Sequence, residues 1–373
     1  MSKTYLLTGG SGFLGSLLSI ELIRRGDRII FLGRSKNGEA FQRRVENILE
    51  FIEPSIFLEN IKTVEVDLYK ENLGLSQNFL NQFSGKIDAI WHLAANLSFR
   101  KKDRKEIFDT NVEGLRNILN LASHIKSPIY YTSTAYVHGQ RTGVIFEDEL
   151  IKPNSFNNPY EESKFESEKI IRKWGEKENN RFIIFRPSIF VETKGKTTSF
   201  FGYYAIAYAL YKLKGNIPKK RIRIFFPFPY SKSAFLNLMP IDIGIEWILK
   251  ISSNSEALGK TFHITNPLPF PIKDVIKQTF EALNIQIPIF MAPRWFIKLF
   301  FFLLNFISFI IKPIRGLAKK LFYYRYYMTE YNIYDMKNTK EVIGQDLVNQ
   351  FHFSSNFIQN IATEFIQKFE KKQ

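Results

Sequence analysis

The sequence has no cysteine and only five histidines among its 373 residues. Without thiols the chain cannot form a disulfide, a thiolate metal site or a covalent cysteine thioester. The histidines lack the spacing of metal ligands, so we expect no bound metal. The N-terminus shows no signal-peptide pattern, which predicts a cytoplasmic protein or one on a cytoplasmic membrane face. The histidines are His92, His124, His138, His263 and His352.

Acidic residues are scarce in two stretches. Residues 194–232 contain nine basic and no acidic residues, and residues 291–330 contain seven basic residues and one acidic residue. Together these stretches supply +15 of the net charge of +16. Local concentrations of positive charge indicate anionic partners, such as phosphates, an acidic carrier protein or anionic lipid. Nucleic acid is the alternative, but no nucleic-acid-binding motif accompanies the charge, so we expect none to bind.

A glycine-rich turn, GGSGFLG over residues 9–15, lies near the N-terminus between two expected strands. The strands are Thr4–Thr8 and Arg28–Leu32, and Leu17–Arg25 between them has helical spacing. In this order the turn brings backbone N–H groups and a helix N-terminus to a pyrophosphate. The context therefore favours a dinucleotide site over a merely structural turn.

Basic residues follow the second expected strand, where Gly33 is succeeded by Arg34, Ser35 and Lys36. An acidic residue at this position holds the ribose hydroxyls of NAD, whereas a basic residue suits the extra phosphate of NADP. Arg34 and Lys36 therefore favour NADP (NADPH) over NAD. The alternative is that both are solvated loop charges.

Four more strands are expected along the first half of the chain. Strands that alternate with helical segments predict an α/β fold, a doubly wound parallel Rossmann sheet with a smaller, largely helical C-terminal substrate lobe. Ligands bind at the carboxyl ends of such strands. His92 lies at one of these ends, and we expect it to pack or to support the site rather than act as a base. The strands are Ile61–Val66, Ala89–Leu93, Ile129–Thr132 and Phe182–Phe185.

Tyr160 and Lys164 stand four residues apart in a segment with helical spacing, Asn157–Ile171. On a helix these positions share a face, so the ammonium is expected beside the phenol, where its charge would lower the pKa of the phenol. Tyr160 is therefore a candidate proton donor. The same spacing occurs by chance in many helices, so the interpretation depends on the segments that precede it.

Six short motifs follow one another along the chain in the order that is typical of one protein family. They are TGGSGFLG at 8–15, VD at 66–67, HLAAN at 92–96, STAYVHG at 133–139, YEESK at 160–164 and FRPS at 185–188. Together they resemble the extended short-chain dehydrogenase/reductase (NAD(P)-binding Rossmann) superfamily. The segments HLAANLSF, NVEGLRNIL, NPYEESKFESEK, FRPSIFVE and NLMPIDIGIEWI are most similar to its thioester-reductase and fatty acyl-CoA reductase, or male-sterility-like, branch. The resemblance extends from Lys3 to about Leu283.

The resemblance implies cofactor contacts. The glycines of the turn match the phosphate site, Asp67 and Leu68 match adenine contacts, and Pro187 and Ser188 match the position that receives the nicotinamide amide. One departure is Val191–Glu192, where the branch tends to have a glycine, and this leaves the substrate side of that loop open. The implied cofactor residues are Thr8, Gly9, Gly12, Phe13, Leu14, Gly15, Arg34, Lys36, Asp67, Leu68, Ala94, Ala95, Asn111, Tyr160, Lys164, Pro187 and Ser188.

The resemblance also implies a catalytic set of Thr134, Tyr160 and Lys164, in which Lys164 is the partner of Tyr160 and holds the nicotinamide ribose. Hydride addition to a carbonyl leaves an oxyanion, which Thr134 and Tyr160 could stabilise while Tyr160 acts as the acid. A thioester adduct would collapse to an aldehyde, and a second hydride would give an alcohol. Because the chain has no cysteine, the hydride must reach the bound substrate directly. The alternative for Thr134 is a hydroxyl that caps the next turn.

Residues 193–232 are aromatic and basic, and Phe200–Leu213 is expected to form a helix. An apolar groove with a basic rim, which includes Lys219–Arg223, would suit a fatty acyl chain on a phosphorylated carrier. The alternative is ordinary core packing with a solvated charge run. The aromatic residues of the expected helix at turn spacing are Phe201, Tyr204, Tyr208 and Tyr211.

Residues 295–328 are the most apolar region, and their polar residues keep to one helical stripe. The uncharged run Leu299–Ile311 has 13 residues, short of the roughly 20 that a spanning helix needs. We expect an amphipathic helix, divided at Pro313, that lies in a membrane interface with its cations on anionic headgroups. The alternative is a lid over the acyl pocket, and the two roles are compatible. The stripe is Lys298, Asn305, Ser308, Lys312, Arg315 and Lys319.

The sequence thus predicts a peripheral, NADPH-dependent reductase of a long-chain acyl thioester, either acyl-CoA or acyl-carrier protein. We expect residues 1–190, with 235–265 returning to them, to form the dinucleotide-binding domain, and residues 191–234 and 266–373 to form the substrate lobe. Within enzymes the alternatives are a 3-hydroxy-lipid or sterol-type dehydrogenase and a nucleotide-sugar epimerase. From another class, the alternative is a non-catalytic cofactor-binding assembly or sensor protein, although such proteins often lose the tyrosine and lysine that this chain retains.

Overall fold

The computed structural model describes residues 2–56, 58–179, 181–193, 201–215, 222–223, 225, 227–329, 331–346 and 353–370. Its centre is a seven-stranded sheet in the order β13-β7-β5-β4-β1-β2-β3, with every neighbouring pair parallel. The strand order reverses between β1 and β4, as in doubly wound folds. The predicted fold class is confirmed. The strands are β1 (Thr4–Thr8), β2 (Arg28–Gly33), β3 (Ile61–Glu65), β4 (Ala89–His92), β5 (Ile129–Thr132), β7 (Phe182–Pro187) and β13 (Thr261–Ile264).

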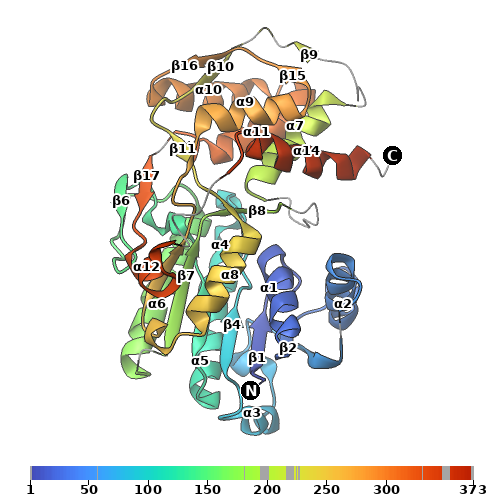
Figure 1. The fold of residues 1–373 in the computed structure, drawn as a ribbon, viewed down its shortest axis with the longest axis vertical. Helices are drawn as coiled ribbons and strands as arrows, with labels where there is room; N and C mark the ends of the chain where they lie inside the picture. Colours follow the sequence, from blue (N-terminus) through green and yellow to red (C-terminus); the bar gives the residue numbers. More distant parts are fainter. Residues whose placement is uncertain are drawn as a thin grey trace.

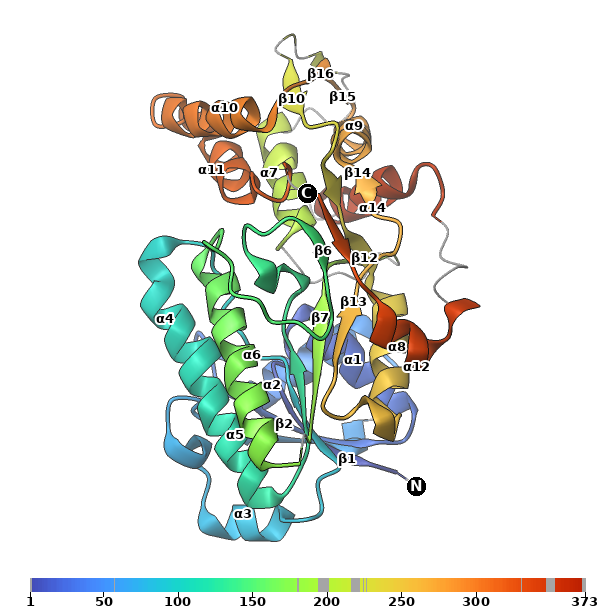
Figure 2. The ribbon, with the colours of Figure 1, turned by 90° about the vertical axis from the view of Figure 1, so that its left-hand side faces the viewer.

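Helices cover both faces of this sheet (Figures 1 and 2). Successive strand side chains point to opposite faces, so Leu7 joins the hydrophobic cluster on one face and Leu6 the cluster on the other. Because both faces are covered, β1 is apolar along its length instead of alternating. On the first face lie α1 (Phe13–Arg24), α2 (Phe41–Ile52) and α8 (Ile241–Ser252); on the second lie α3 (Gln77–Phe83), α4 (Arg104–Phe108), α5 (Gly114–Ile125) and α6 (Pro159–Lys177).

A second layer of elements lies beyond the carboxyl ends of the strands (Figure 1). Its side chains form a third hydrophobic cluster, separate from the two on the sheet. The helices are α7 (Tyr203–Lys214), α9 (Ile272–Ala282), α10 (Arg294–Ile307), α11 (Arg315–Tyr324) and α14 (Phe357–Glu370). The short strands are β8 (Ile189–Val191), β9 (Ile222–Arg223), β10 (Phe228–Tyr230), β11 (Phe235–Leu236), β12 (Leu238–Pro240), β14 (Phe270–Pro271), β15 (Ile285–Gln286) and β16 (Ile289–Met291).

One late segment returns from the second layer to the sheet. β17 (Asn332–Tyr334) pairs in parallel with β6 (Gly143–Ile145). α12 (Lys337–Ile343) follows and packs against α8 and β13, where Met336 and Ile343 join the first cluster. Residues 332–343 therefore belong structurally with the sheet, although they lie far along the chain.

The apolar region of residues 295–328 forms two helices, α10 and α11. A 3₁₀ turn, Lys312–Ile314, separates them and contains Pro313, as expected for a proline inside an apolar helical pattern. Within the described ranges, every helix is too short or too polar to cross a membrane.

Candidate active site

The glycine-rich turn joins β1 to α1 and touches the chain that leaves β4. Gly9 has a φ of +77°, and a Cβ atom there would lie 2.6 Å from Ala94 N. A Cβ atom on Gly15 would lie 2.2 Å from Gly9 O, so α1 begins in direct contact with the turn. The first turn of α1 contains no acidic residue, which leaves its N–H groups available to an anion. This arrangement is a cradle into which pyrophosphate oxygens fit.

Thr8 and His92 support the turn from inside the sheet. Thr8 Oγ1 lies 2.8 Å from His92 Nδ1 and accepts a hydrogen bond from Ala94 N at 3.3 Å. Burial lowers the pKa of His92 to about 3, so the imidazole is neutral, and it stacks on Tyr131 at 5.8 Å between ring centres. His92 thus holds two strand ends together, as expected of a packing residue. Ala95, beside Ala94, is partly exposed.

The residues predicted to hold the adenosine half lie at the ends of β2 and β3. Arg34 and Lys36 follow β2 with exposed side chains, and Lys36 exchanges backbone hydrogen bonds with Glu39, which shapes the loop. Asp67 follows β3, and its carboxylate accepts a hydrogen bond from Tyr69 N at 3.0 Å. Because β1, β2 and β3 are parallel neighbours, these residues and the glycine turn share one edge of the sheet. Leu68, next to Asp67, receives a hydrogen bond from Asn117 at its carbonyl oxygen, at 2.7 Å.

Thr134 and Tyr160 meet between the end of β5 and the first turn of α6. The Thr134 hydroxyl accepts a hydrogen bond from Tyr136 N at 3.3 Å, so it caps the following 3₁₀ turn, Ala135–His138, and it also hydrogen-bonds with the Tyr160 side chain. The start of α6 is firmly defined, because Asn158 accepts a hydrogen bond from Glu161 N at 3.0 Å. The structure therefore brings the predicted hydroxyl and phenol together.

Lys164 does not act on Tyr160 in the expected way. Its Nζ atom lies 6.0 Å from the Tyr160 ring centre and donates instead to Thr132 O at 2.7 Å and Tyr131 Oη at 3.1 Å. Burial lowers the pKa of Lys164 to about 7. Burial also raises the pKa of Tyr160 above its ordinary value, and the hydrogen bond with Thr134 opposes that shift. The prediction that Lys164 lowers the pKa of the phenol is thus wrong here, and the partly buried Tyr160 is a protonated donor at neutral pH.

Asn111 lies in a π-helical turn, Asp109–Glu113, between α4 and α5. Its side chain donates to Asn96 O at 3.0 Å and Ser163 Oγ at 2.8 Å, and accepts from Asn96 N at 2.7 Å. Its carbonyl oxygen accepts a hydrogen bond from Ser167 at 2.9 Å. Asn111 therefore links the loop after β4 to the helix that carries Tyr160. Such π turns are frequent at functional sites.

Pro187 and Ser188 lie at the end of β7. Ser188 N donates to Ile264 O at 3.1 Å, but Ser188 Oγ is buried and has no hydrogen-bond partner among the described residues. Leaving a buried polar group unpaired costs about 1–3 kcal/mol. Ser188 Oγ is therefore a place where a bound amide would gain a hydrogen bond. Close by, Glu192 is buried and its N–H donates to Tyr204 Oη at 2.8 Å, which anchors the loop after β8 to α7.

An aromatic cluster connects Tyr160 with the second layer. The Phe99 ring centre lies 6.0 Å from that of Tyr160, 5.3 Å from Tyr324 and 5.9 Å from Tyr327. Tyr327 Oη accepts from Asn158 at 2.9 Å and donates to the buried carboxylate of Glu161. The first turn of α6 is thereby tied to the residues that follow α11.

Sequence reasoning missed Phe99, Tyr327 and the contact of Tyr131 with Lys164. Phe99 stands within the HLAANLSF motif, and Tyr327 stands within an aromatic run, FYYRYYM. Neither pattern distinguishes one ring from its neighbours. The pairing of Tyr131 with Lys164 depends on the packing of α6 against β5, which only the structure shows.

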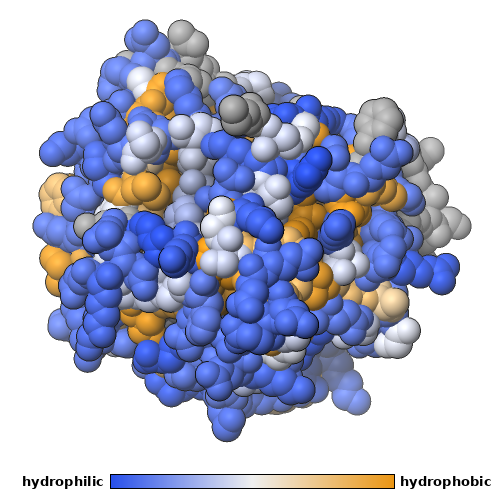
Figure 3. Space-filling view, turned by 90° about the horizontal axis from the view of Figure 1, so that it is seen from below, coloured by the Kyte–Doolittle hydropathy of each residue, from blue (hydrophilic) through white to orange (hydrophobic). Residues whose placement is uncertain are grey.

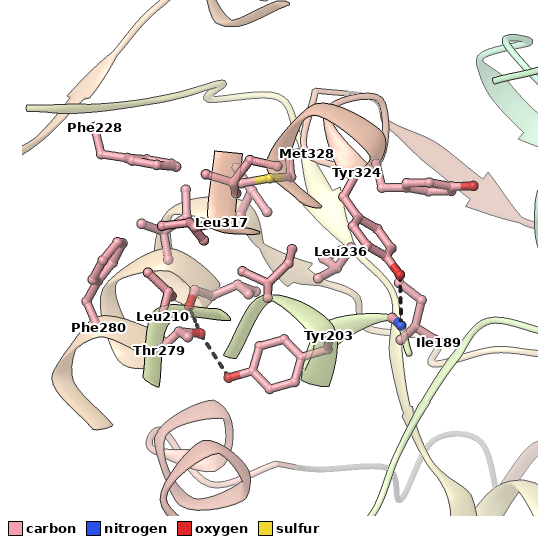
Figure 4. A pocket seen from close by; sticks show the side chains of 17 residues that line it. Ile189, Tyr203, Leu210, Phe228, Leu236, Thr279, Phe280, Leu317, Tyr324 and Met328 are labelled. Atoms are coloured by element: carbon pink, nitrogen blue, oxygen red, sulfur yellow. Dashed lines mark hydrogen bonds between the residues drawn. The ribbon is translucent and has the colours of Figure 1, made fainter. Parts of the chain in front are cut away.

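An apolar cavity of about 60 Å³ lies between α7, α9 and α11 (Figure 4). Four of the residues on its wall form hydrogen bonds with each other: Tyr203 Oη lies 2.9 Å from Thr279 Oγ1, and Tyr324 Oη accepts from Gly202 N at 3.0 Å. Tyr324 and Tyr327 line the cavity and also touch Phe99, so the cavity begins beside the aromatic cluster. Its dry wall suits an alkyl chain.

The tyrosines expected to line a groove on α7 face the opposite side. Tyr204 packs on Phe365 at 4.6 Å, and Tyr208 and Tyr211 pack on Phe369 of α14 at 4.9 and 5.8 Å between ring centres. The core-packing alternative is therefore correct for these side chains. Much of the expected basic rim lies outside the described residues. The residues concerned are Lys194, Lys196, Lys219, Lys220 and Arg221, and Phe200, the expected first residue of the helix, also lies outside the described residues.

The fold and the arranged residues define an NAD(P)-binding protein of the extended short-chain dehydrogenase/reductase type. The chain belongs to the family described as male sterility protein, whose model matches residues 7–248. The predicted resemblance to that branch is confirmed, and the relatives and structural neighbours include fatty acyl-CoA reductases, reductase domains of peptide synthetases and nucleotide-sugar epimerases.

Three comparisons show the breadth of the similarity. The terminal R domain from the myxalamid PKS-NRPS biosynthetic pathway superposes with a TM-score of 0.79 at 25% identity, covering 99% of this chain and 92% of that one. Fatty acyl-CoA reductase 1 of Mus musculus is 31% identical over 163 residues, 40% of this chain and 31% of that protein. UDP-glucuronic acid 4-epimerase from Bacillus cereus, solved with NAD, shares the fold at a TM-score of 0.65 and 16% identity, covering 98% of this chain and 99% of that one. The chain spans less than half the length of the curated relatives that it matches.

Proposed function

We propose that the protein is an NADPH-dependent reductase that converts a long-chain acyl thioester to an aldehyde or an alcohol. The observation that carries this proposal is the position of the apolar cavity, whose lining residues Tyr324 and Tyr327 reach Tyr160 through Phe99. A reactive carbonyl at Tyr160 would leave its alkyl chain directed to the cavity. Similarity to a fatty acyl-CoA reductase and to the myxalamid R domain supports a thioester substrate.

The residues present fit a dinucleotide. A side chain at Gly9 or Gly15 would collide with the backbone of Ala94 or Gly9, so only glycine allows the turn this shape, and Ser188 Oγ is a buried hydroxyl without a hydrogen-bond partner among the described residues. Arg34 and Lys36 are exposed beyond β2, where they would meet the extra phosphate of NADPH and favour it over NADH. When bound, NADPH supplies the hydride.

Side chains of the protein then stabilise the developing negative charge and supply the proton. As hydride adds to the carbonyl carbon, Thr134 and Tyr160 stabilise the oxygen, and Tyr160 delivers its proton to it. The resulting hemithioacetal loses its thiol, the carbon–sulfur bond breaks, and an aldehyde remains. Lys164, held by Thr132 O and Tyr131, positions the cofactor ribose and the first turns of α6.

We also propose that different parts of the chain bind the cofactor and the substrate. Residues 1–190, 235–265 and 332–343 would bind the cofactor, and residues 191–234 with the remainder of 266–373 would hold the acyl chain. The sheet-bound position of β17 and α12 is the reason for placing residues 332–343 with the cofactor part rather than with the substrate lobe.

The proposal is tested by following NADPH consumption with acyl-CoAs of increasing length, aldehydes, 3-keto lipids and nucleotide sugars. Because the chain has no cysteine, every thiol that a colorimetric reagent detects comes from the substrate. We expect NADPH oxidation together with thiol release from long acyl-CoAs. Turnover of ketones or aldehydes alone would identify a dehydrogenase. Tight NADPH binding without any turnover would point to a carrier-protein substrate or to a non-catalytic protein.

A further inference from the structure

α10 turns an apolar face outward. Trp295, Phe302 and Phe306 are 67%, 54% and 63% exposed, whereas Ile297 and Phe301 on the opposite side are buried. The exposed positions follow helical spacing, so they form one face. The apolar patch, as we define it, consists of Trp295, Leu299, Phe302, Leu303, Phe306, Ile307, Phe309, Ile310 and Ile311.

This exposure reverses the usual orientation of an amphipathic helix. Ser308, which belongs to the predicted polar stripe, is buried, and Lys298 lies over the Tyr326 ring at 4.9 Å. Lys298 and Ser308 therefore meet the protein and the apolar side of α10 meets the solvent, while Lys312, Arg315 and Lys319 of the same stripe are exposed beyond the end of α10. The molecule seen from below is mostly hydrophilic by comparison (Figure 3). A contiguous exposed apolar patch marks an interaction surface.

Positive charge surrounds the patch. Arg294 begins α10, and Lys312, Arg315 and Lys319 follow its far end, with the Arg315 guanidinium 5.3 Å from the Phe309 ring centre. The sequence has no acidic residue from 291 to 329. In a two-fold contact between copies of this face, cations would meet cations. An anionic surface is the complementary partner, and long basic side chains beside apolar ones suit lipid headgroups.

The patch and the cavity are neighbours. α11 packs beside α10 and lies nearer to the sheet (Figure 2). Leu317, Leu321 and Tyr324 of α11 line the cavity. The α10–α11 pair therefore presents the apolar patch on one side and part of the cavity wall on the other.

We infer that α10 docks into the surface of an anionic lipid bilayer, with the apolar patch among the acyl chains and the flanking cations on lipid phosphates. The bilayer then delivers substrates whose acyl chains enter the cavity, a step that rests on the proposed function. Each basic residue near an anionic surface strengthens binding, so docking depends on both apolar contact and charge.

Vesicle flotation tests the docking without any enzymatic readout. The full chain is mixed with vesicles of phosphatidylcholine alone or of phosphatidylcholine and phosphatidylglycerol at roughly 3:1. We expect the wild type to float with the mixed vesicles, and the double variants Phe302→Ser/Phe306→Ser and Lys312→Glu/Arg315→Glu to bind at least about tenfold more weakly. The control is Phe51→Ser, which removes an equally exposed ring, 62% exposed, from α2 and leaves binding unchanged.

The inference would be overturned if the wild type floated with neither kind of vesicle, or if the patch variants floated as well as the wild type. It would also be overturned if light scattering showed that the wild type is an oligomer and that the patch variants are monomers, because the patch would then be an interface between copies of the chain. Turnover of a short, soluble acyl-CoA without vesicles separates this inference from the proposed function. We expect the patch variants to keep that turnover. Vesicle binding without turnover of any thioester would leave the docking intact and refute the proposed reductase.

Discussion

The sheet edge, by which we mean the carboxyl ends of the strands near Thr134 and Tyr160, and the apolar cavity in the second layer are built in different ways. At the sheet edge, buried polar groups are held in a fixed geometry: Glu168 pairs with Arg186 at 2.7 Å and accepts from Ser133 at 2.6 Å, directly before Thr134. In the cavity, the wall is apolar, and the hydroxyl groups of Tyr203 and Thr279 pair with each other. The fixed polar groups at the sheet edge determine where the substrate reacts, and the cavity determines only the size and polarity of the substrate that fits. Changes at the sheet edge should therefore alter the rate, and changes in the cavity should alter the choice of substrate.

The largest expected effect comes from removing the proton donor at the sheet edge. Tyr160→Phe should lower kcat by about 10²–10⁴-fold, because general acid catalysis contributes that much. NADPH affinity, measured by fluorescence titration, should stay nearly the same. The control Tyr130→Phe removes a hydroxyl that bonds Ser252 O on the other face of the sheet and should keep full turnover. An active Tyr160→Phe enzyme would refute the mechanism.

A change in the cavity should act selectively. Leu317→Trp replaces an aliphatic side chain of the cavity wall with a bulky indole ring. It should lower kcat/KM for long acyl-CoAs by about tenfold or more, as expected of a filled apolar pocket. Short acyl-CoAs should be affected little. The control Leu258→Trp changes an exposed leucine outside both the cavity wall and the apolar patch and should keep the wild-type preference. Equal losses at every chain length would show that the cavity does not hold the acyl chain.

A smaller effect concerns the choice between cofactors. Arg34→Ala should weaken NADPH binding by roughly tenfold, since hydrogen bonds to charged groups are worth about 1.5–3 kcal/mol. NADH binding should change little, because that cofactor lacks the extra phosphate. Arg28→Ala, at the opposite end of β2, is the matched control. If titration shows that both cofactors lose affinity equally, Arg34 does not select NADPH.

The smallest effect is a change in how stability depends on pH. The pKa of Lys164 falls from 10.5 to about 7 in the folded chain. Between these values the unfolded chain holds a proton that the folded chain has lost, so this residue makes stability rise with pH. Urea unfolding from pH 7 to 9 should show the wild type gaining stability relative to Lys164→Met. Lys169→Met, an exposed position on the same helix, should keep the wild-type dependence. Parallel curves for all three proteins would mean that Lys164 is charged when folded.

Six of the seven strands of the sheet could be predicted from sequence to within two residues at each end, whereas β13 was not among the expected strands. β1 and β5 have the expected bounds, because buried parallel strands are short apolar runs that end at glycine or polar residues. The π turn at Asn111 could not be predicted, since one extra residue in a turn barely alters helical periodicity. Likewise, the acceptors of Lys164 come from β5, more than thirty residues earlier.

The second layer was predictable in its elements but not in its orientation. Periodicity places Tyr204, Tyr208 and Tyr211 on one side of α7, but it cannot show that α14, from the end of the chain, covers that side. The same limit applies to α10, where the sequence predicts a polar stripe and an apolar face but does not show that Ser308 is buried and Phe302 exposed. Hydrophobic patterning indicates that a helix has two faces. Only the packing partners decide which face is exposed.

The central claim is that the sheet edge reduces a thioester whose chain lies in the cavity. The most direct test supplies NADPH deuterated at the transferring position together with a long-chain acyl-CoA, and examines the product by mass spectrometry. The account predicts deuterium on the former carbonyl carbon of an aldehyde or alcohol, with thiol released in step. Intact acyl-CoA in the presence of bound NADPH, alongside deuterium transfer to a ketone or an aldehyde, would contradict it.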